Sequence, residues 1–215
     1  MKIAQGAKNW ILTPFLCALI SGILGIFLYS TLQMIMWLLS FLLLLLTAVF
    51  LIFFRDPDRR IGPGIVAVAD GKIRSVKQCH DEHVGESLFI STFMNINNVH
   101  VNRMPVDGSI QKITHINGSY LPAFKKESER NERIIYEIKS DIGPIKIIQI
   151  AGTIARRIVP YVTKSTTLKK GEKIGIIRLG SRVDIYLPTY TVKEPIIKKG
   201  ARVKAGVDCI AEINA

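Results

Sequence analysis

At 215 residues the chain has room for one domain of ordinary size and an additional segment. Its formal net charge of +12 at pH 7 attracts nucleic acid, anionic lipid headgroups or other acidic ligands, and composition alone does not choose among them. The three cysteines, Cys17, Cys79 and Cys209, are an odd number with one in an apolar stretch, which argues against a disulfide framework and indicates a reducing compartment.

The first 54 residues have the composition of a membrane segment. They contain no Asp or Glu, and their only basic residues are Lys2 and Lys8. Two apolar stretches, 11–29 and 34–54, are each near the length that crosses a bilayer as a helix. Because only residues 30–33 separate them, the sequence predicts a transmembrane helical hairpin.

The charges that flank the hairpin predict its orientation. Lys2 and Lys8 precede it and Arg55, Arg59 and Arg60 follow it, so the positive-inside tendency puts both ends in the cytoplasm. We therefore expect a protein of the cell membrane with its remaining domain on the cytoplasmic side. Two alternatives are a cleavable signal peptide, disfavoured because no small-residue cleavage site precedes the second stretch, and one span followed by a re-entrant segment.

A stretch rich in turn-forming residues, 55–64, follows the membrane anchor and begins a second domain. The predicted domains are residues 1–54 and 55–215. Every acidic residue and all but two of the 29 lysines and arginines lie in the second domain, which is therefore basic. Because the anchor holds this domain at a membrane, we expect its acidic partner to be lipid and predict no nucleic-acid partner.

Short β-branched runs that alternate with Gly, Pro, Asn and Asp predict a mainly β second domain. The expected strands are 65–69, 72–77, 88–93, 110–116, 134–138, 145–150, 173–178 and 183–187. A short helix is expected only within 152–161. Two glycine turns, 168–175 and 197–206, look like the hammerhead turns of lipoyl and biotinyl domains, so the expected architecture resembles a barrel-sandwich. Neither turn offers a lysine in an exposed setting for modification, so no carrier function is expected.

The dipeptide Gly180-Ser181 interrupts a strand-like run near the C-terminus. Glycine leaves an unhindered carbonyl in a backbone that is free to adopt unusual φ and ψ angles, and a neighbouring hydroxyl attacks such a carbonyl most easily. The dipeptide is therefore a candidate self-processing bond. The alternative is a β-bulge that carries a solvent-facing serine.

A second cluster of chemically active side chains runs through Cys79, His80, Asp81, Glu82 and His83. These residue types bind metals, and zinc sites commonly combine two such clusters. Because only one cluster is present, among polar and loop-like residues, we predict no metal site.

Six motifs follow one another along the chain in a fixed order. They are Phe54–Pro57, Ala69-Asp70-Gly71, Asn98–Pro105, Asn131-Glu132-Arg133, Gln149–Gly152 followed by Ala155–Val159, and Gly175–Asp184. Any one of these motifs is weak, whereas the ordered set resembles the short-type phosphatidylserine decarboxylase family, which includes archaetidylserine decarboxylase, over residues 53–213. The resemblance implies a membrane-bound carboxy-lyase whose prosthetic group is made from its own chain.

The resemblance also implies self-cleavage between Gly180 and Ser181. In the family the serine hydroxyl attacks the preceding carbonyl in an N-to-O acyl shift, elimination cuts the ester, and hydrolysis of the resulting dehydroalanine leaves a pyruvoyl group. Ser181 would become that pyruvoyl group, and the zymogen would become a heterodimer of residues 1–180 and 181–215. The sequence leaves open whether this pair forms a higher homo-oligomer.

A pyruvoyl group implies a particular reaction. Its ketone forms a Schiff base with the substrate amine and takes up electrons as carbon dioxide leaves, a task that pyridoxal phosphate performs elsewhere. The resemblance therefore implies neither pyridoxal phosphate nor a metal. The implied substrate is a serine-headgroup phospholipid, phosphatidylserine or the archaeal ether lipid archaetidylserine, and the product is the ethanolamine phospholipid. The sequence does not separate the two lipids.

Five further positions are candidate site residues through the same resemblance. His100 and Asp70 match the family's base and the group that orients it. Long-type members carry a second histidine where this chain has Arg103, so His100 is the candidate for the self-cleavage base, for the acid of decarboxylation, or for both. Arg103 is a candidate ligand for the substrate carboxylate or phosphate, or else a solvated strand residue. Arg156 and Arg157 either bind lipid phosphate or face water.

Two other functions are consistent with parts of the sequence. A membrane-tethered, non-catalytic basic β domain that binds anionic lipid predicts one intact chain of 24.0 kDa and a dispensable Ser181. A pyruvoyl enzyme that acts on a free amino acid is disfavoured, because a soluble substrate needs no membrane anchor.

Overall fold

The computed structural model describes residues 2–118, 131–152, 157–178 and 181–214. The chain divides into two compact units, Met1–Asp58 and Arg59–Ala215. The boundary expected from the sequence, after residue 54, lies close to the end of the first unit.

The first unit consists of two apolar helices, α1 (Lys8–Phe27) and α2 (Ser30–Phe53). Their lengths, 20 and 24 residues, and their composition are sufficient to cross a membrane, so they indicate membrane association. The expected pair of apolar helices is confirmed. The connection is Leu28–Tyr29 rather than 30–33, because Ser30 already begins α2.

Small residues bring α1 and α2 close together. A Cβ atom on Gly25 would lie 2.3 Å from the Trp37 ring, so only glycine fits at this contact. The Ser40 hydroxyl donates to the Ala18 carbonyl across the pair at 2.8 Å. Close packing and a hydrogen bond between the helices therefore stabilise the hairpin.

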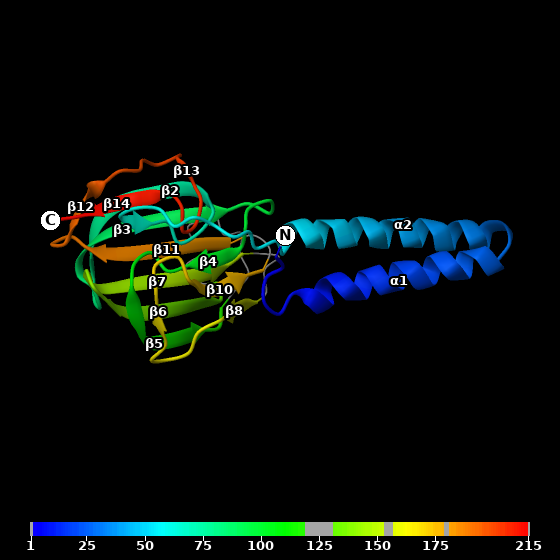
Figure 1. Ribbon diagram of the computed structural model, residues 1–215, viewed down its shortest axis with the longest axis horizontal. Helices are drawn as coiled ribbons and strands as arrows, with labels where there is room; N and C mark the ends of the chain where they lie inside the picture. The colour runs from blue at the N-terminus through cyan, green and yellow to red at the C-terminus, as the bar shows by residue number, and fades with distance from the viewer. Residues whose placement is uncertain (1, 119–130, 153–156, 179–180, 215) are drawn as a thin grey trace. The chain divides into compact units, whose positions relative to one another are not determined.

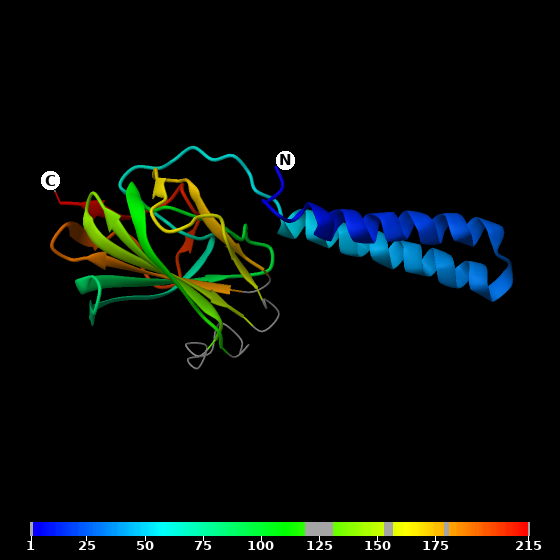
Figure 2. The same cartoon turned by 90° about the horizontal axis from the view of Figure 1, so that it is seen from below.

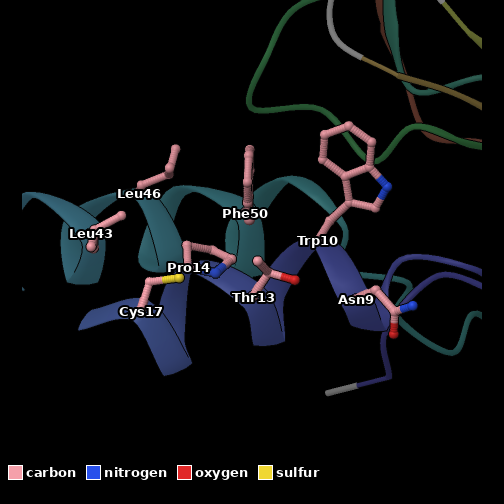
Figure 3. A pocket seen from close by; sticks show the side chains of 8 residues that line it. All are labelled: Asn9, Trp10, Thr13, Pro14, Cys17, Leu43, Leu46 and Phe50. Atoms are coloured by element: carbon pink, nitrogen blue, oxygen red, sulfur yellow. The ribbon is translucent and has the colours of Figure 1, made fainter. Parts of the chain in front are cut away.

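A recess of about 440 Å³ lies along the hairpin. Figure 3 shows its lining side chains, which come from both helices: Asn9, Trp10, Thr13, Pro14, Cys17, Leu43, Leu46 and Phe50. The rings of Trp10 and Phe50 meet edge to face, with centroids 6.1 Å apart. The recess is almost entirely apolar, as expected for a surface that a bilayer surrounds.

The second unit is built from fourteen described strands. They are β1 (Ile65–Val66), β2 (Gly71–Asp81), β3 (Gly85–Met94), β4 (Val101–Arg103), β5 (Gly108–Ile116), β6 (Arg133–Ser140), β7 (Gly143–Ala151), β8 (Ile158–Pro160), β9 (Thr167–Leu168), β10 (Lys173–Ile177), β11 (Ser181–Pro188), β12 (Val192–Pro195), β13 (Arg202–Val203) and β14 (Cys209–Ile213). The prediction of a mainly β domain is confirmed.

The strands form three antiparallel sheets (Figure 1). The largest has the order β13-β2-β3-β11-β7-β6-β5-β9, and Figure 2 shows how strongly it twists. The two smaller sheets have the orders β4-β10-β8 and β1-β14-β12. β11 is an inner strand of the largest sheet, paired along its length with β3 on one side and over Ser181–Tyr186 with β7 on the other.

Alternation along the strands separates a core face from an outer face. In β11 the side chains of Ser181, Val183 and Ile185 are buried among aliphatic residues, whereas Arg182 and Tyr186 lie on the opposite face and are partly exposed. The serine that begins this strand therefore faces the hydrophobic core.

Two details of the predicted secondary structure differ. The short helix expected within 152–161 is wrong over Ile158–Pro160, which is strand β8, because pairing with β10 overrides the local preference. Strands β4, β12 and β13 are too short to leave a periodic signal in the sequence, and β14 was not predicted. The expected resemblance to a barrel-sandwich stays a prediction.

Candidate active site

Ser181 is the first residue of β11 and is fully buried. Its neighbours across the sheet are Met94 at the end of β3 and Ala151 at the end of β7. The serine hydroxyl donates to the Met94 sulfur at 3.3 Å. A thioether is a weak acceptor that does not take up a proton, so this hydroxyl is loosely held. Gly180, the other half of the predicted cleavage site, lies outside the described residues.

The same sulfur ends a chain of buried polar side chains. Tyr136 donates to Gln149 at 2.6 Å, and Gln149 donates to Asn102 at 2.7 Å. The Asn102 side-chain nitrogen then faces Met94 at 3.7 Å. All four residues are fully buried, so β3, β4, β6 and β7 each contribute one polar or sulfur group to the surroundings of Ser181.

His100 is fully buried immediately before β4. The His100 backbone carbonyl accepts a hydrogen bond from the Ile177 amide at 3.4 Å, so His100 lies beside the end of β10. This strand ends shortly before Gly180-Ser181 in the sequence. Its Nδ1 atom lies 2.9 Å from the Asn98 carbonyl, which only accepts. Nδ1 therefore carries the hydrogen, and in the neutral ring Nε2 is the basic nitrogen.

Asp70 immediately precedes β2 and is buried in a charged cluster. Arg59 binds both of its carboxylate oxygens, at 2.5 and 2.8 Å, and the Ala205 backbone amide donates to one of them at 2.8 Å. Arg59 also donates to the Ala205 carbonyl at 2.7 Å. Within the described part of the chain these are the partners of the Asp70 carboxylate, so the structure does not bring Asp70 onto His100. Its predicted role in orienting the base stays a prediction.

Arg103 is buried at the end of β4. Its guanidinium donates to the Gly171 carbonyl at 2.9 Å, and a Cβ atom on Gly206 would lie 3.0 Å from its Cδ atom. Arg103 therefore packs between the two glycine turns noted in the sequence, where it lines a recess of about 420 Å³. Because successive residues of a strand point to opposite faces, Asn102 and Arg103 diverge, and binding of substrate by Arg103 stays a prediction.

Arg178 is a basic residue near Ser181 that the sequence did not single out. Its backbone amide donates to the Arg157 carbonyl at 3.2 Å, where the end of β10 lies beside the start of β8. Burial, together with the charge of Arg157, lowers the pKa of Arg178 below its usual range. Arg157 is exposed, whereas Arg156 lies outside the described residues. Two guanidinium groups that repel one another favour an anion between them.

The cluster around Cys79 does not gather into a metal site. His80 pairs with Glu86 at 2.8 Å, and His83 lies 3.7 Å from Glu137. Among the described residues no group of three or more His, Cys, Asp or Glu side chains is arranged to hold a metal ion. The three cysteines are free, and burial raises the pKa of Cys79 and of Cys209.

Comparison with known protein sequences identifies the family of this chain. The family model for phosphatidylserine decarboxylase matches residues 46–211. The chain belongs to the phosphatidylserine decarboxylase family. The resemblance seen in the motifs is therefore confirmed. The members of this family are carboxy-lyases.

The relatives come from both bacteria and archaea. A phosphatidylserine decarboxylase proenzyme of Streptomyces coelicolor is 45% identical over 163 residues, which cover 75% of this chain and 72% of the relative. A proposed archaetidylserine decarboxylase proenzyme of Methanosarcina barkeri is 40% identical over 216 residues, which cover 99% of each chain. Another from Methanococcoides burtonii is 41% identical over 98% of this chain and 96% of its own length. The names of these phosphatidylserine decarboxylase family members describe enzymes made as precursors.

Sequence reasoning named Ser181 as a candidate but not the polar side chains that lie near it in the fold. Met94, Tyr136, Asn102 and Gln149 meet only because four strands converge, and in sequence they look like ordinary strand residues. Asn102 and Gln149 do lie inside motifs shared with the decarboxylase family. A polar residue in an otherwise apolar alternation is the signal that would have found them.

Proposed function

We propose that the protein is a pyruvoyl-dependent decarboxylase of a serine-headgroup phospholipid, phosphatidylserine or archaetidylserine, activated by self-cleavage at Gly180-Ser181. The observation that carries the proposal is the burial of Ser181 at the start of an inner strand, with its hydroxyl donating to a thioether. A serine with only a structural role, or one that faces solvent, would not need to be buried at the start of β11. The names of the archaeal and bacterial relatives support both lipids.

In the proposed cleavage, the Ser181 oxygen attacks the Gly180 carbonyl carbon as His100 Nε2 accepts the hydroxyl proton. The Gly180–Ser181 peptide bond breaks, and an ester forms in its place. Loss of the residue 181 Cα proton then breaks the ester C–O bond, which leaves a Gly180 carboxylate and a dehydroalanine. The dehydroalanine tautomerises to an imine, and water replaces the imine nitrogen, which releases ammonia and leaves the pyruvoyl ketone on Cα. The hydrogen bond from Nδ1 to Asn98 supports this role for His100, because it keeps Nε2 basic.

The residues around Ser181 fit a pyruvoyl group. Both adjacent strands fix the backbone at residue 181, and full burial excludes the water that would compete with a substrate amine. Once formed, the pyruvoyl group supplies the electron sink for loss of carbon dioxide. His100 is proposed to deliver the proton to the decarboxylated product as well, because a nitrogen that has accepted a proton can return one.

The two fragments would stay together through strand pairing and through the charged cluster at Asp70. Residues 181–215 contain β11 and β14, each paired on both sides, and β12 and β13. Ala205 is bound through its amide by Asp70 and through its carbonyl by Arg59. These contacts support a stable heterodimer of residues 1–180 and 181–215 without a covalent link.

Arg157 and Arg178 are proposed to bind the substrate phosphate or carboxylate. They lie at the ends of β8 and β10, upstream of Ser181 along the chain, and their mutual repulsion is relieved by an anion. The apolar hairpin is proposed to hold the domain at the cytoplasmic face of the membrane, where the serine headgroups of the lipids are accessible.

The mass of the purified protein tests this proposal. We expect two chains that divide after Gly180, with the smaller one blocked to Edman sequencing and reactive toward hydrazines. Purified protein should convert serine-headgroup lipid to ethanolamine lipid, and diacyl and archaeal ether substrates offered in parallel should reveal the preference. An active preparation that contains only the intact 24.0 kDa chain would refute the pyruvoyl mechanism.

A further inference from the structure

The recess of about 420 Å³ where the two glycine turns meet is rich in cations. Arg103, Lys170 and Lys173 contribute three positive charges to its lining. Glu172 contributes one negative charge, so the lining carries 3 − 1 = +2. Arg103 is buried, and both lysines are partly buried. Such a concentration of positive charge in a concave surface attracts an anion.

Strand pairing holds two of these cations opposite each other. Arg103 ends β4 and Lys173 begins β10, and the two residues are direct partners in the antiparallel pairing of these strands. Side chains of direct partners lie on the same face of a sheet, and like charges in this position destabilise it. An anion bound between the two side chains would offset their repulsion.

The turn that carries Lys170 is fixed from several directions. The Gly171 amide donates to the Met104 carbonyl at 2.8 Å, and the Gly171 carbonyl accepts from Arg103 at 2.9 Å. Gly171 has a φ of +84°, and a Cβ atom at this position would overlap Ile61 Cδ1. Backbone hydrogen bonds and close packing therefore hold the recess in shape before a ligand arrives.

The recess lies away from the candidate active site. Lys173 is the first residue of β10 and Ile177 the last, so the recess and the strand end that precedes Ser181 are roughly 13 Å apart along the strand. Arg103 and its neighbour Asn102 also point to opposite faces of β4, and it is Asn102 that faces the surroundings of Ser181. The phosphate of a serine headgroup is only a few bonds from its amine, so a headgroup that reacts at residue 181 does not reach the recess.

We propose that this recess binds the phosphate group of a second, anionic ligand, with Arg103, Lys170 and Lys173 as its cationic partners. A lipid headgroup and a soluble phosphate compound offer the same chemistry to these side chains. The inference does not depend on self-cleavage at residue 181.

The apolar part of the lining favours a lipid as the source of the phosphate. Ile61 and Leu168 line the recess together with the cations, and Ile61 is 42% exposed. These side chains can contact the glycerol carbon atoms of a headgroup, whereas an inorganic ion gains nothing from them. Ile61 also belongs to the segment 55–64, which follows the membrane anchor in the sequence.

The test uses the full chain in neutral detergent micelles. Phosphatidylglycerol, an anionic lipid without a serine headgroup, is compared with glycerol 1-phosphate as a soluble source of phosphate. Lys170→Gln combined with Lys173→Gln removes two cations and keeps the buried Arg103. Lys198→Gln combined with Lys199→Gln is the matched control, because these exposed lysines lie in the other glycine turn and outside the lining of the recess.

We expect phosphatidylglycerol to bind the wild type and the control equally, and the Lys170 and Lys173 double variant roughly 10- to 100-fold more weakly, as for the loss of charged hydrogen bonds. The affinity should fall as salt is added. A defect confined to phosphatidylglycerol supports a lipid headgroup as the ligand, and an equal defect for glycerol 1-phosphate supports a phosphate site that needs no lipid.

A second measurement needs no variant. Acetic anhydride modifies lysine amines, and mass spectrometry locates each acetyl group. Bound phosphatidylglycerol should slow the acetylation of Lys170 and Lys173 but not of Lys198 and Lys199. If the double variant does not fold, this protection decides the matter.

Equal weakening by both double variants, or no protection of Lys170 and Lys173, would overturn the site. A chain that shows this protection but is never cleaved would refute the proposed decarboxylase and leave the anion site standing. The failures of the two proposals are therefore distinguishable.

Discussion

Two buried polar clusters in the β domain differ in charge and in strength. Around Ser181, an uncharged chain of Tyr136, Gln149 and Asn102 ends on a thioether. Around Ala205, the ion pair of Arg59 and Asp70 binds both the amide and the carbonyl of one residue. The first cluster leaves a hydroxyl loosely held, and the second holds a backbone segment tightly.

The difference suggests a division of tasks. A residue that must change its covalent structure needs neighbours that bind it weakly before the change, because a strongly satisfied hydroxyl would resist rotation and attack. A fragment that must remain bound after its peptide bond is cut needs strong, charge-assisted contacts. The predictions below test this division, from the largest expected effect to the smallest.

Ser181→Ala removes the hydroxyl that is proposed to attack Gly180. We expect no cleavage and no decarboxylation, with folding and membrane insertion retained because alanine suits a buried strand position. Mass spectrometry and a lipid decarboxylation assay measure the two losses. Residual decarboxylation by purified Ser181→Ala would contradict the assignment of residue 181.

Asp70→Asn breaks the charged cluster and leaves Arg59 buried without its counter-charge. Since the two side chains are only 9% and 8% exposed, we expect a loss of about 3 kcal/mol in the free energy of unfolding. Denaturant unfolding in the uncleaved Ser181→Ala background measures this without interference from fragment dissociation.

Arg59→Met is the matched partner of Asp70→Asn, because it disrupts the same ion pair from the other side. If the Arg59–Asp70 ion pair serves to hold the 181–215 fragment, both variants in an otherwise wild-type chain should be cleaved and should then release this fragment more readily. If Asp70→Asn blocks cleavage and Arg59→Met does not, the role of Asp70 is instead to orient the base of self-cleavage.

Arg178→Gln should weaken substrate binding by removing one of two cations near the site. We expect KM for the lipid to rise about tenfold, as for the loss of one charged hydrogen bond, with cleavage unchanged. Kinetics on mixed micelles measure the effect. Lys112→Gln, which removes an equal charge from the exposed pair with Glu137 on β5 and β6, is the control and should leave KM unaltered.

The smallest effect concerns the ion pair of Asp81 and Lys146. Burial of Asp81 opposes its ionisation, but hydrogen bonds from Lys146 and from the backbone amides of His83 and Val84 prevail and lower its pKa. A lowered pKa in the folded state stabilises the protein above the ordinary aspartate pKa of about 4, and this contribution is lost as the pH falls through the folded value.

Asp81→Asn should therefore destabilise the protein at neutral pH and approach the wild type in acid. Chemical unfolding of both proteins at pH 7 and at pH 3 measures the difference in free energy. A difference that stays constant or widens as the pH falls would contradict this sign.

The sequence by itself determined the elements whose signals are local. Uninterrupted apolar composition over the first 54 residues predicts α1 and α2, because burial in lipid needs no partner elsewhere in the chain. β-branched runs predict β2, β3, β5, β6, β7 and β11, since their alternation is long enough to be recognised. Gly180-Ser181 became a candidate through its own chemistry and through a family motif, and His100 through a family motif alone.

Only the tertiary structure decided which side chains surround Ser181 and which surround Asp70. Met94 and Asn102 lie on consecutive strands, but Gln149 is 47 residues from Asn102 and Ser181 is 87 residues from Met94, so their contacts depend on register rather than on local composition. Likewise, Arg59 and Ala205 meet Asp70 across 11 and 135 residues of chain. Long-range pairing leaves no periodic trace in a sequence. For this reason the uncharged side chains near Ser181 and the charged cluster of Arg59 and Asp70 became visible only in the fold.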